Sequence, residues 1–182
     1  MQPIIKNLKA SFYAKYPVLR FIIIFATLMG AFYFLFFTPF FNRLFPTYLQ
    51  FNAKISGIIL NWLGQNVSVV GANIISSQFS ISIKGGCDGL EPTAFFICAV
   101  LAFPAPFLLK IPGVILGTLC LVILNFARII SLFLIGVYYP QAFEIMHIEV
   151  WQVLFIIFAL SFFILWLLWA IQHEISQQQI TG

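Results

Sequence analysis

Long apolar runs constrain this chain more than any other feature of its sequence. Residues 21–37, "FIIIFATLMGAFYFLFF", carry no charge, and similar runs fill much of the second half. About 20 apolar residues form a helix that crosses the ~30 Å hydrocarbon core of a bilayer. Only 8% of the residues are charged, against roughly 25% in soluble domains. The sequence therefore predicts an all-α integral membrane protein, with residues 1–182 forming a single membrane domain.

Four transmembrane helices are expected, at about residues 20–38, 88–104, 111–135 and 147–170. The first follows a basic segment and is not followed by a small-residue cleavage site, which favours an uncleaved anchor with a cytoplasmic N-terminus. With four spans the C-terminus is cytoplasmic as well. The net charge of +4 is too small and too scattered to indicate a nucleic-acid partner. The N-terminal segment owes its basic character to three lysines, Lys6, Lys9 and Lys15.

Residues 39–86 are expected to lie outside the membrane on the extracytoplasmic side. Within them, "YLQFNAKISGIILNWLG" (residues 48–64) has apolar residues at helical spacing, interrupted by polar ones. This pattern is typical of an amphipathic helix lying at the interface. Counting this helix as a fifth span would move Cys87 to the cytoplasm, but its polar content opposes that. Further on, Phe79, Ile81 and Ile83 alternate with serines, which predicts a short β-hairpin before the second span.

Three side chains with possible chemical roles are expected at a similar depth. At 1.5 Å per residue, Cys87 and Arg128 each lie ~26 Å from the turn that joins the second and third spans. His147 lies ~28 Å along the last span from Trp166, which places it at a similar level. The sequence alone does not show that the three side chains touch.

Arg128 lies in "LCLVILNFARIISLFLIGV", with apolar residues on both sides. A charge at this position needs a partner inside the helix bundle. Asn125 lies three residues earlier on the same helical face and can help to solvate it. The alternative is a structural arginine that binds a lipid headgroup or pairs with an acidic residue. The candidates for such a pair are Glu91, Glu144 and Glu149.

Cys87 lies in "KGGCDGLEP", where the expected strand gives way to the second span. A helix N-terminus and a nearby Arg128 would favour its thiolate, whereas Asp88 and Glu91 would oppose it. The flanking glycines, including Gly89, leave room for another backbone to approach. The alternative is a flexible hinge that contains an incidental cysteine.

His147 begins the last expected span, and Glu144 could orient its ring if the intervening turn is helical. The alternative for His147 is a polar residue at a helix end. Thiol, imidazole and guanidinium are together the components of a thiol acyl-transfer site. No metal or cofactor is expected, because the three cysteines show no metal-ligand spacing.

Three segments together resemble the exosortase/archaeosortase family: "GANIISSQFSISIKGGCDGLEP", "LNFARIISLFLIG" and "FEIMHIEVWQ". The resemblance extends over about residues 45–170. It implies a cysteine transpeptidase or protease that acts on secreted proteins bearing a C-terminal sorting signal. In this family's chemistry Cys87 would be the nucleophile, Arg128 would stabilise the anion and His147 would exchange protons. Asp88 departs from the small residue that often follows the cysteine.

The resemblance leads to a specific functional expectation. The enzyme would work at the outer face of the cytoplasmic membrane and cleave the sorting signal through a thioester. Its partners would be the C-terminal helix of the secreted protein and membrane lipids. Two alternatives stay open: a non-enzymatic assembly factor for envelope or exopolysaccharide machinery, and a lipid- or anion-binding membrane protein that uses Arg128.

Overall fold

Apolar helices dominate the computed structural model, which describes residues 16–181, with side chains up to residue 173. Three helical segments are long and apolar enough to cross a membrane: Pro17–Phe36, Phe107–Tyr138 and Pro140–His173. This confirms the predicted all-α membrane class. The N-terminal lysines, on which the cytoplasmic placement of that terminus depends, lie outside the described residues.

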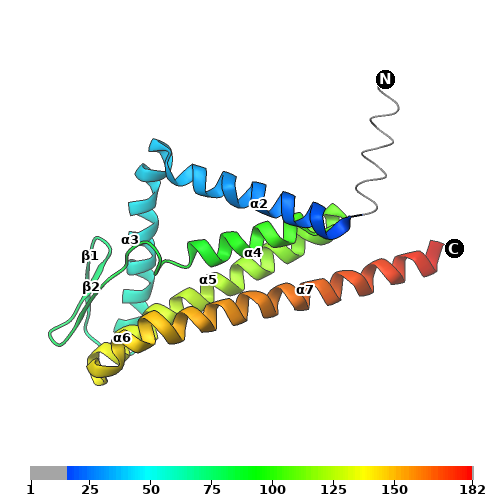
Figure 1. The fold of residues 1–182 in the computed structure, drawn as a ribbon. Helices are drawn as coiled ribbons and strands as arrows, with labels where there is room; N and C mark the ends of the chain where they lie inside the picture. Colours follow the sequence, from blue (N-terminus) through cyan, green and yellow to red (C-terminus); the bar gives the residue numbers. More distant parts are fainter. Residues whose placement is uncertain (1–15, 182) are drawn as a thin grey trace.

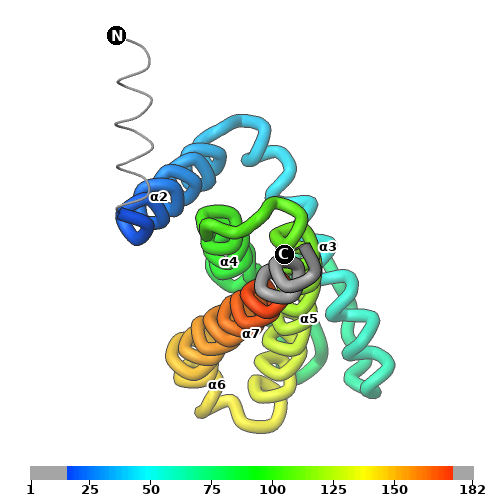
Figure 2. Tube along the Cα trace, turned by 90° about the vertical axis from the view of Figure 1, so that its right-hand side faces the viewer, coloured from blue at the N-terminus to red at the C-terminus, as the bar shows by residue number. Residues whose placement is uncertain are grey.

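Three helices, α4 (Leu90–Ala102), α5 (Phe107–Tyr138) and α7 (Trp151–Thr181), lie side by side (Figure 1). Their shared core includes Phe96, Leu121 and Phe155. Helix α2 (Pro17–Phe36) packs on α4, with the rings of Phe25 and Phe95 4.7 Å apart, and none of its residues is buried. In Figure 2, α2 lies on one side of the three-helix group and α3 on another.

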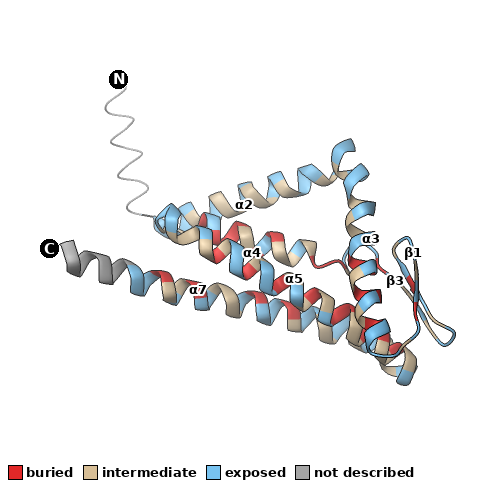
Figure 3. Cartoon of the chain, turned by 180° about the vertical axis from the view of Figure 1, so that it is seen from behind, coloured by how far each residue is buried: buried red, intermediate tan, exposed pale blue. Residues whose placement is uncertain are grey.

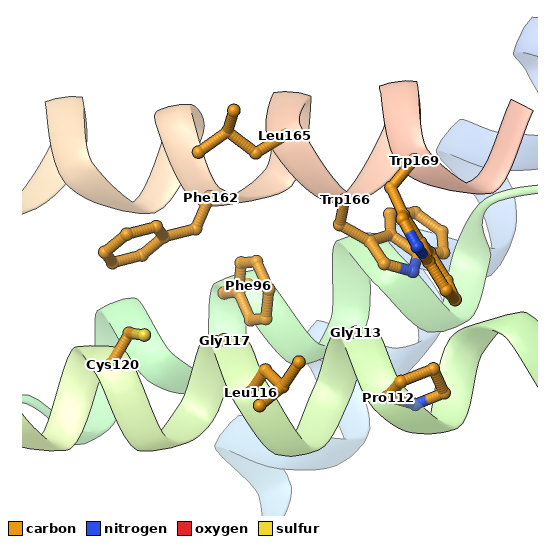
Figure 4. Close-up of a pocket in the computed structure, with 10 residues that line it drawn as sticks. All are labelled: Phe96, Pro112, Gly113, Leu116, Gly117, Cys120, Phe162, Leu165, Trp166 and Trp169. Carbon is orange, nitrogen blue, oxygen red and sulfur yellow. The ribbon is translucent and has the colours of Figure 1, made fainter. Parts of the chain in front are cut away.

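Two glycines one helical turn apart allow close packing inside this group. A Cβ atom at Gly113 would overlap the ring of Trp166, and one at Gly117 would overlap the ring of Phe96. Beside these contacts α4, α5 and α7 form an apolar groove of about 320 Å³, shown in Figure 4. The groove is lined mainly by the first half of α5 and the middle of α7, away from Arg128 in the second half of α5 and from His147, which precedes α7.

The second expected span, residues 88–104, is shorter in the structure. Helix α4 has 13 residues and is therefore only ~20 Å long, less than the ~30 Å of a hydrocarbon core. It begins after Gly89, which has a φ of 73°, and ends at Phe103, whose backbone is extended before Pro104. The third span is longer than predicted, since α5 begins at Phe107 and ends at Tyr138.

The prediction that His147 begins the last span is wrong. Helical structure starts with a 3-10 turn, η1 (Pro140–Ala142), and continues through α6 (Phe143–Ile145), a π turn, η2 (Met146–Val150), and α7. Pro140 has no N–H and a fixed φ, which suits it to a first helical position. His147 consequently lies inside a continuous helical segment.

Helix α3 (Pro39–Trp62) crosses the ends of the other helices rather than running along them (Figure 1). It starts nine residues before the predicted amphipathic segment, because Thr38 caps it with a side-chain oxygen that accepts the Phe41 N–H at 3.3 Å. One face of α3 is buried, at Asn52, Ala53, Ser56, Gly57 and Leu60.

A three-stranded antiparallel sheet replaces the predicted hairpin. Its strands are β1 (Ser68–Val70), β2 (Asn73–Ile75) and β3 (Ser80–Ser82), in the order β1-β2-β3. The additional turn forms at Ser76, whose hydroxyl accepts the N–H groups of Gln78 and Phe79. The sheet contacts α3 and the end of α5, where Phe79 packs over Gly136. Figure 3 shows buried residues both in this region and between the three packed helices.

Candidate active site

Cys87 lies in the loop that joins β3 to α4, and backbone geometry fixes its position. Its N–H donates to the carbonyl oxygen of Lys84 at 3.0 Å. Gly86 and Gly89 on either side have φ angles of 88° and 73°, which side-chain-bearing residues rarely adopt. A Cβ atom at Gly89 would also lie 2.9 Å from the side chain of Asn125. The loop therefore needs glycine at residue 89 both for its conformation and for its contact with α5.

His147 meets Cys87 although 60 residues separate them. The Sγ of Cys87 lies 2.7 Å from Nε2 of His147, which is close enough for proton transfer. The imidazole projects from the π turn η2, and it stacks on the ring of Phe143 with centroids 5.5 Å apart and planes 16° apart. The aromatic contact thus orients the ring from one side, and the sulfur lies at its Nε2 edge.

Arg128 completes the group from α5. Its side chain is only 5% exposed, and Nη2 lies 3.9 Å from the Cys87 sulfur. The guanidinium carbon is 5.7 Å from the centre of the Phe155 ring, and Nε is buried without a hydrogen-bond partner among the described residues. Within that same part of the chain no carboxylate forms an ion pair with Arg128, and its guanidinium makes its one hydrogen bond to the thiol.

The acidic residues considered as partners for Arg128 or His147 are elsewhere. Glu91, Glu144 and Glu149 are all exposed. Among the side chains that the structure describes, Glu144 makes no hydrogen bond to His147, so the expected orienting contact is not formed. The ring of Phe143 contacts the imidazole instead.

A chain of buried polar contacts lies beneath the Cys87 loop. The Tyr48 hydroxyl donates to the backbone carbonyl of Asp88 at 2.8 Å. Asn52 donates from Nδ2 to the Tyr48 carbonyl at 3.0 Å, and Asn125 donates from Nδ2 to Oδ1 of Asn52 at 3.3 Å. Asn125 therefore lies on the predicted face of α5, but it bonds to α3 rather than to Arg128.

Asp88 has a structural role that explains a carboxylate beside the thiol. The residue is 2% exposed, and its Oδ1 accepts the N–H of Leu90 at 2.7 Å. This bond satisfies one of the free N–H groups at the start of α4. Burial raises the pKa of the Asp88 carboxyl, and the hydrogen bond from Leu90 lowers it.

Three effects act on the pKa of Cys87 in opposite directions. Burial raises the pKa of the thiol, the Arg128 guanidinium lowers it, and the Asp88 carboxylate raises it. The net direction is upward, which favours the protonated thiol over the thiolate. A base within hydrogen-bond distance is then required for attack, and Nε2 of His147 is that close.

All three residues lie in the part of the chain that one protein-family model matches. A family model described as transmembrane exosortase matches residues 12–167. The chain belongs to the transmembrane exosortase family. No curated protein and no solved structure matches the chain.

The exosortase match extends from before α2 to the second half of α7, and so includes Cys87, Arg128 and His147. These three residues were predicted from the sequence of this exosortase, whereas Tyr48 and Asn52 were not. Both residues lie four apart on α3, and that spacing could have indicated a shared face. Only the position of α3 shows that the face is turned toward the Cys87 loop.

Proposed function

We propose that the protein is a cysteine transpeptidase or protease that cleaves the C-terminal sorting signal of secreted, membrane-anchored proteins. The observation that carries the proposal is the 2.7 Å approach of Cys87 Sγ to His147 Nε2, with Arg128 at 3.9 Å from the same sulfur. Membership in the exosortase family supports a membrane transpeptidase or protease. The active site would face the extracytoplasmic side of the cytoplasmic membrane, with both termini in the cytoplasm.

The first half of the reaction forms a thioester. As Cys87 Sγ attacks the carbonyl carbon of the scissile peptide bond, its proton passes to Nε2 of His147. The oxyanion of the tetrahedral intermediate is stabilised by the positive charge of Arg128. When the C–N bond breaks, the amine of the departing C-terminal signal takes the proton from His147. The acyl group is then held on Cys87 as a thioester.

The second half releases the acyl group. An amine acceptor or a water molecule attacks the thioester carbonyl and passes a proton to His147. The C–S bond breaks, and the leaving sulfur takes that proton back, so the enzyme returns to its initial state. An amine yields a transferred protein, and water yields a hydrolysed one.

Membrane anchoring of both partners assists the encounter. A substrate held by its own C-terminal helix diffuses in the plane of the bilayer and presents its cleavage site at a fixed depth. Restricting the reactants in this way reduces the entropy lost on reaching the reactive geometry.

The test compares secreted proteins in cells that carry Cys87→Ala with those in cells carrying the native chain. We expect uncleaved precursors that retain a C-terminal helix to accumulate, as seen by mass spectrometry of their C-terminal peptides. Cys120→Ala is the matched control, since Cys120 lies on the exposed surface of α5 in the apolar groove region. Normal processing in the Cys87→Ala cells would refute the nucleophile assignment.

One other role has an observation in its favour. Nε of Arg128, which is buried and has no hydrogen-bond partner among the residues that the structure describes, also suits binding of an anionic group without any covalent chemistry. That role predicts that Cys87→Ser retains function while Arg128→Gln loses it. The proposed enzyme loses function in both variants.

A further inference from the structure

The outer edge of β3 has unpaired backbone groups. Toward β2, Ile83 donates its N–H to the carbonyl of Ala72, and Phe79 accepts at its carbonyl from the N–H of Ser76, both at 2.9 Å. Ile81 pairs with Ile74 between these two bonds. Odd-numbered residues of this segment thus turn their N–H and C=O groups to β2. Backbone groups alternate sides along a strand, so those of the even-numbered residues point away.

The even-numbered residues are Ser80 and Ser82, and both are exposed. β3 is the last strand in the sheet order. Within the described part of the chain, neither residue makes a side-chain hydrogen bond or a backbone bond outside the sheet, and the register with β2 leaves their backbone groups on the outer side. Two N–H donors and two C=O acceptors therefore alternate along a free edge. Such an edge is a template for another extended peptide, because a second backbone repeats donors and acceptors with the same spacing.

Both ends of this segment lead to the candidate active site. Before β3, the Phe79 ring lies 5.2 Å from that of Phe143, which in turn stacks on His147. After β3, five residues lead from Ser82 to Cys87. The strand thus runs between the aromatic support of the imidazole and the thiol.

The strand also descends toward the site along α5. Phe79 packs on Gly136, and Cys87 lies against Arg128. Eight helical residues separate those two levels, about 12 Å along the helix axis. A chain that lies beside β3 and runs in the same direction would therefore arrive at the level of the thiol.

We propose that the free edge of β3 binds the extended segment of the substrate that precedes the scissile bond, by adding it to the sheet as a parallel strand. This inference rests on the proposed function. A substrate anchored by its C-terminal helix runs from the aqueous side toward the membrane, as β3 does toward Cys87. Backbone hydrogen bonds to Ser80 and Ser82 would hold the segment extended, and the bond that follows it would reach the sulfur.

Proline at residue 82 tests the edge directly. The Ser82 N–H points away from β2, so Ser82→Pro removes an outward donor and fills the edge without breaking the β2 ladder. Ser82→Ala is the matched control, since it retains the N–H. Processing is followed on the secreted proteins whose uncleaved precursors accumulate in Cys87→Ala cells. We expect about tenfold slower processing in Ser82→Pro cells, and a clearly smaller reduction in Ser82→Ala cells, which retain the N–H. Labelling of Cys87 by iodoacetamide should be unchanged in both variants.

A second measurement reports binding without depending on catalysis. In a Cys87→Ala background, the photoreactive residue p-benzoylphenylalanine replaces either Ser82 or Val70. Val70 is 61% exposed but lies in β1, at the other side of the sheet. We expect precursor to be cross-linked from residue 82 and not from residue 70.

The outcomes separate this inference from the proposed function. Normal processing in Cys87→Ala cells would refute the function itself. Blocked processing in those cells, together with native rates in Ser82→Pro cells, would support the proposed function but refute substrate binding at the β3 edge. If Ser82→Pro also slowed Cys87 labelling, the cross-link would decide, and absence of precursor at residue 82 would overturn the proposal. Cross-linking of two copies of this chain there, without precursor, would assign the edge to self-association and overturn it as well.

Discussion

The charge of Arg128 should control the reactivity of Cys87. The two groups approach to 3.9 Å, where unit charges interact by about 1 kcal/mol in bulk water and about 4 kcal/mol at an effective dielectric constant of 20. The thiol is half-buried, so the interaction falls between these limits. Each 1.4 kcal/mol is a factor of ten, and Arg128→Gln should therefore reduce the thiolate population by roughly one to three powers of ten.

Alkylation by neutral iodoacetamide in lipid nanodiscs measures this effect, since only the thiolate reacts. Cys98→Ala and Cys120→Ala in the background leave Cys87 as the only thiol. In the native chain the rate rises with pH through the pKa of Cys87. Arg128 lowers that pKa, so in Arg128→Gln the rise should move to higher pH and the rate at pH 7 should fall.

Arg128→Lys is the matched control, because it retains the positive charge on a different side chain. It should label faster than Arg128→Gln at every pH below the plateau. The thermal unfolding temperature of each variant shows whether the fold is retained. A folded Arg128→Gln variant that labels within twofold of the native rate at pH 7 would refute the electrostatic argument.

Two further predictions concern the Cys87 loop. Asp88→Asn removes a charge that raises the pKa of Cys87 but keeps an oxygen to accept the Leu90 N–H, so the pH profile of alkylation should move to lower pH; an unchanged profile would contradict this. Gly89→Ala should cost about 1–2 kcal/mol for the left-handed backbone alone, plus the contact with Asn125, and should lower the unfolding temperature by several degrees. Gly30→Ala is the control and should not lower it, because an added Cβ there would meet no atom of another helix or side chain within 4 Å.

Hydropathy was sufficient to predict the membrane class, because length and apolarity alone determine whether a helix can cross a bilayer. Helix ends depend on local chemistry that is harder to weigh. The cap at Thr38 and the turn at Ser76 each use a hydroxyl bond to backbone N–H groups. Serine and threonine occur in many other settings, so the sequence alone did not indicate these bonds.

For Cys87, Arg128 and His147, the sequence predicted a similar depth along the helices but not that the side chains meet. Counting 1.5 Å per residue gives a height along a helix but no direction around its axis. Tyr48 and Asn52 were interpreted as polar interruptions of an interfacial helix, since nothing local distinguishes a solvent-facing amide from a buried one. Their partners lie about 40 and 73 residues away in the chain, and such contacts depend on how α3 crosses the helix ends.

The π turn at Met146–Val150 lets one helical segment meet two requirements, a packed core face on α7 and an imidazole directed at the thiol. A π turn holds about one residue more than an α turn, and each residue of an α-helix turns the chain by about 100°. His147 lies eight residues before Phe155, so in an unbroken α-helix it would be rotated by about 80° from the face that buries Phe155 and Trp166. The extra residue of the π turn removes most of that offset. Substitutions that forced this segment into regular α geometry with its length unchanged would keep the packed core, but they would rotate the imidazole away from the thiol. Loss of reactivity by a change of helical register, with the chemical groups all still present, is thus built into this segment.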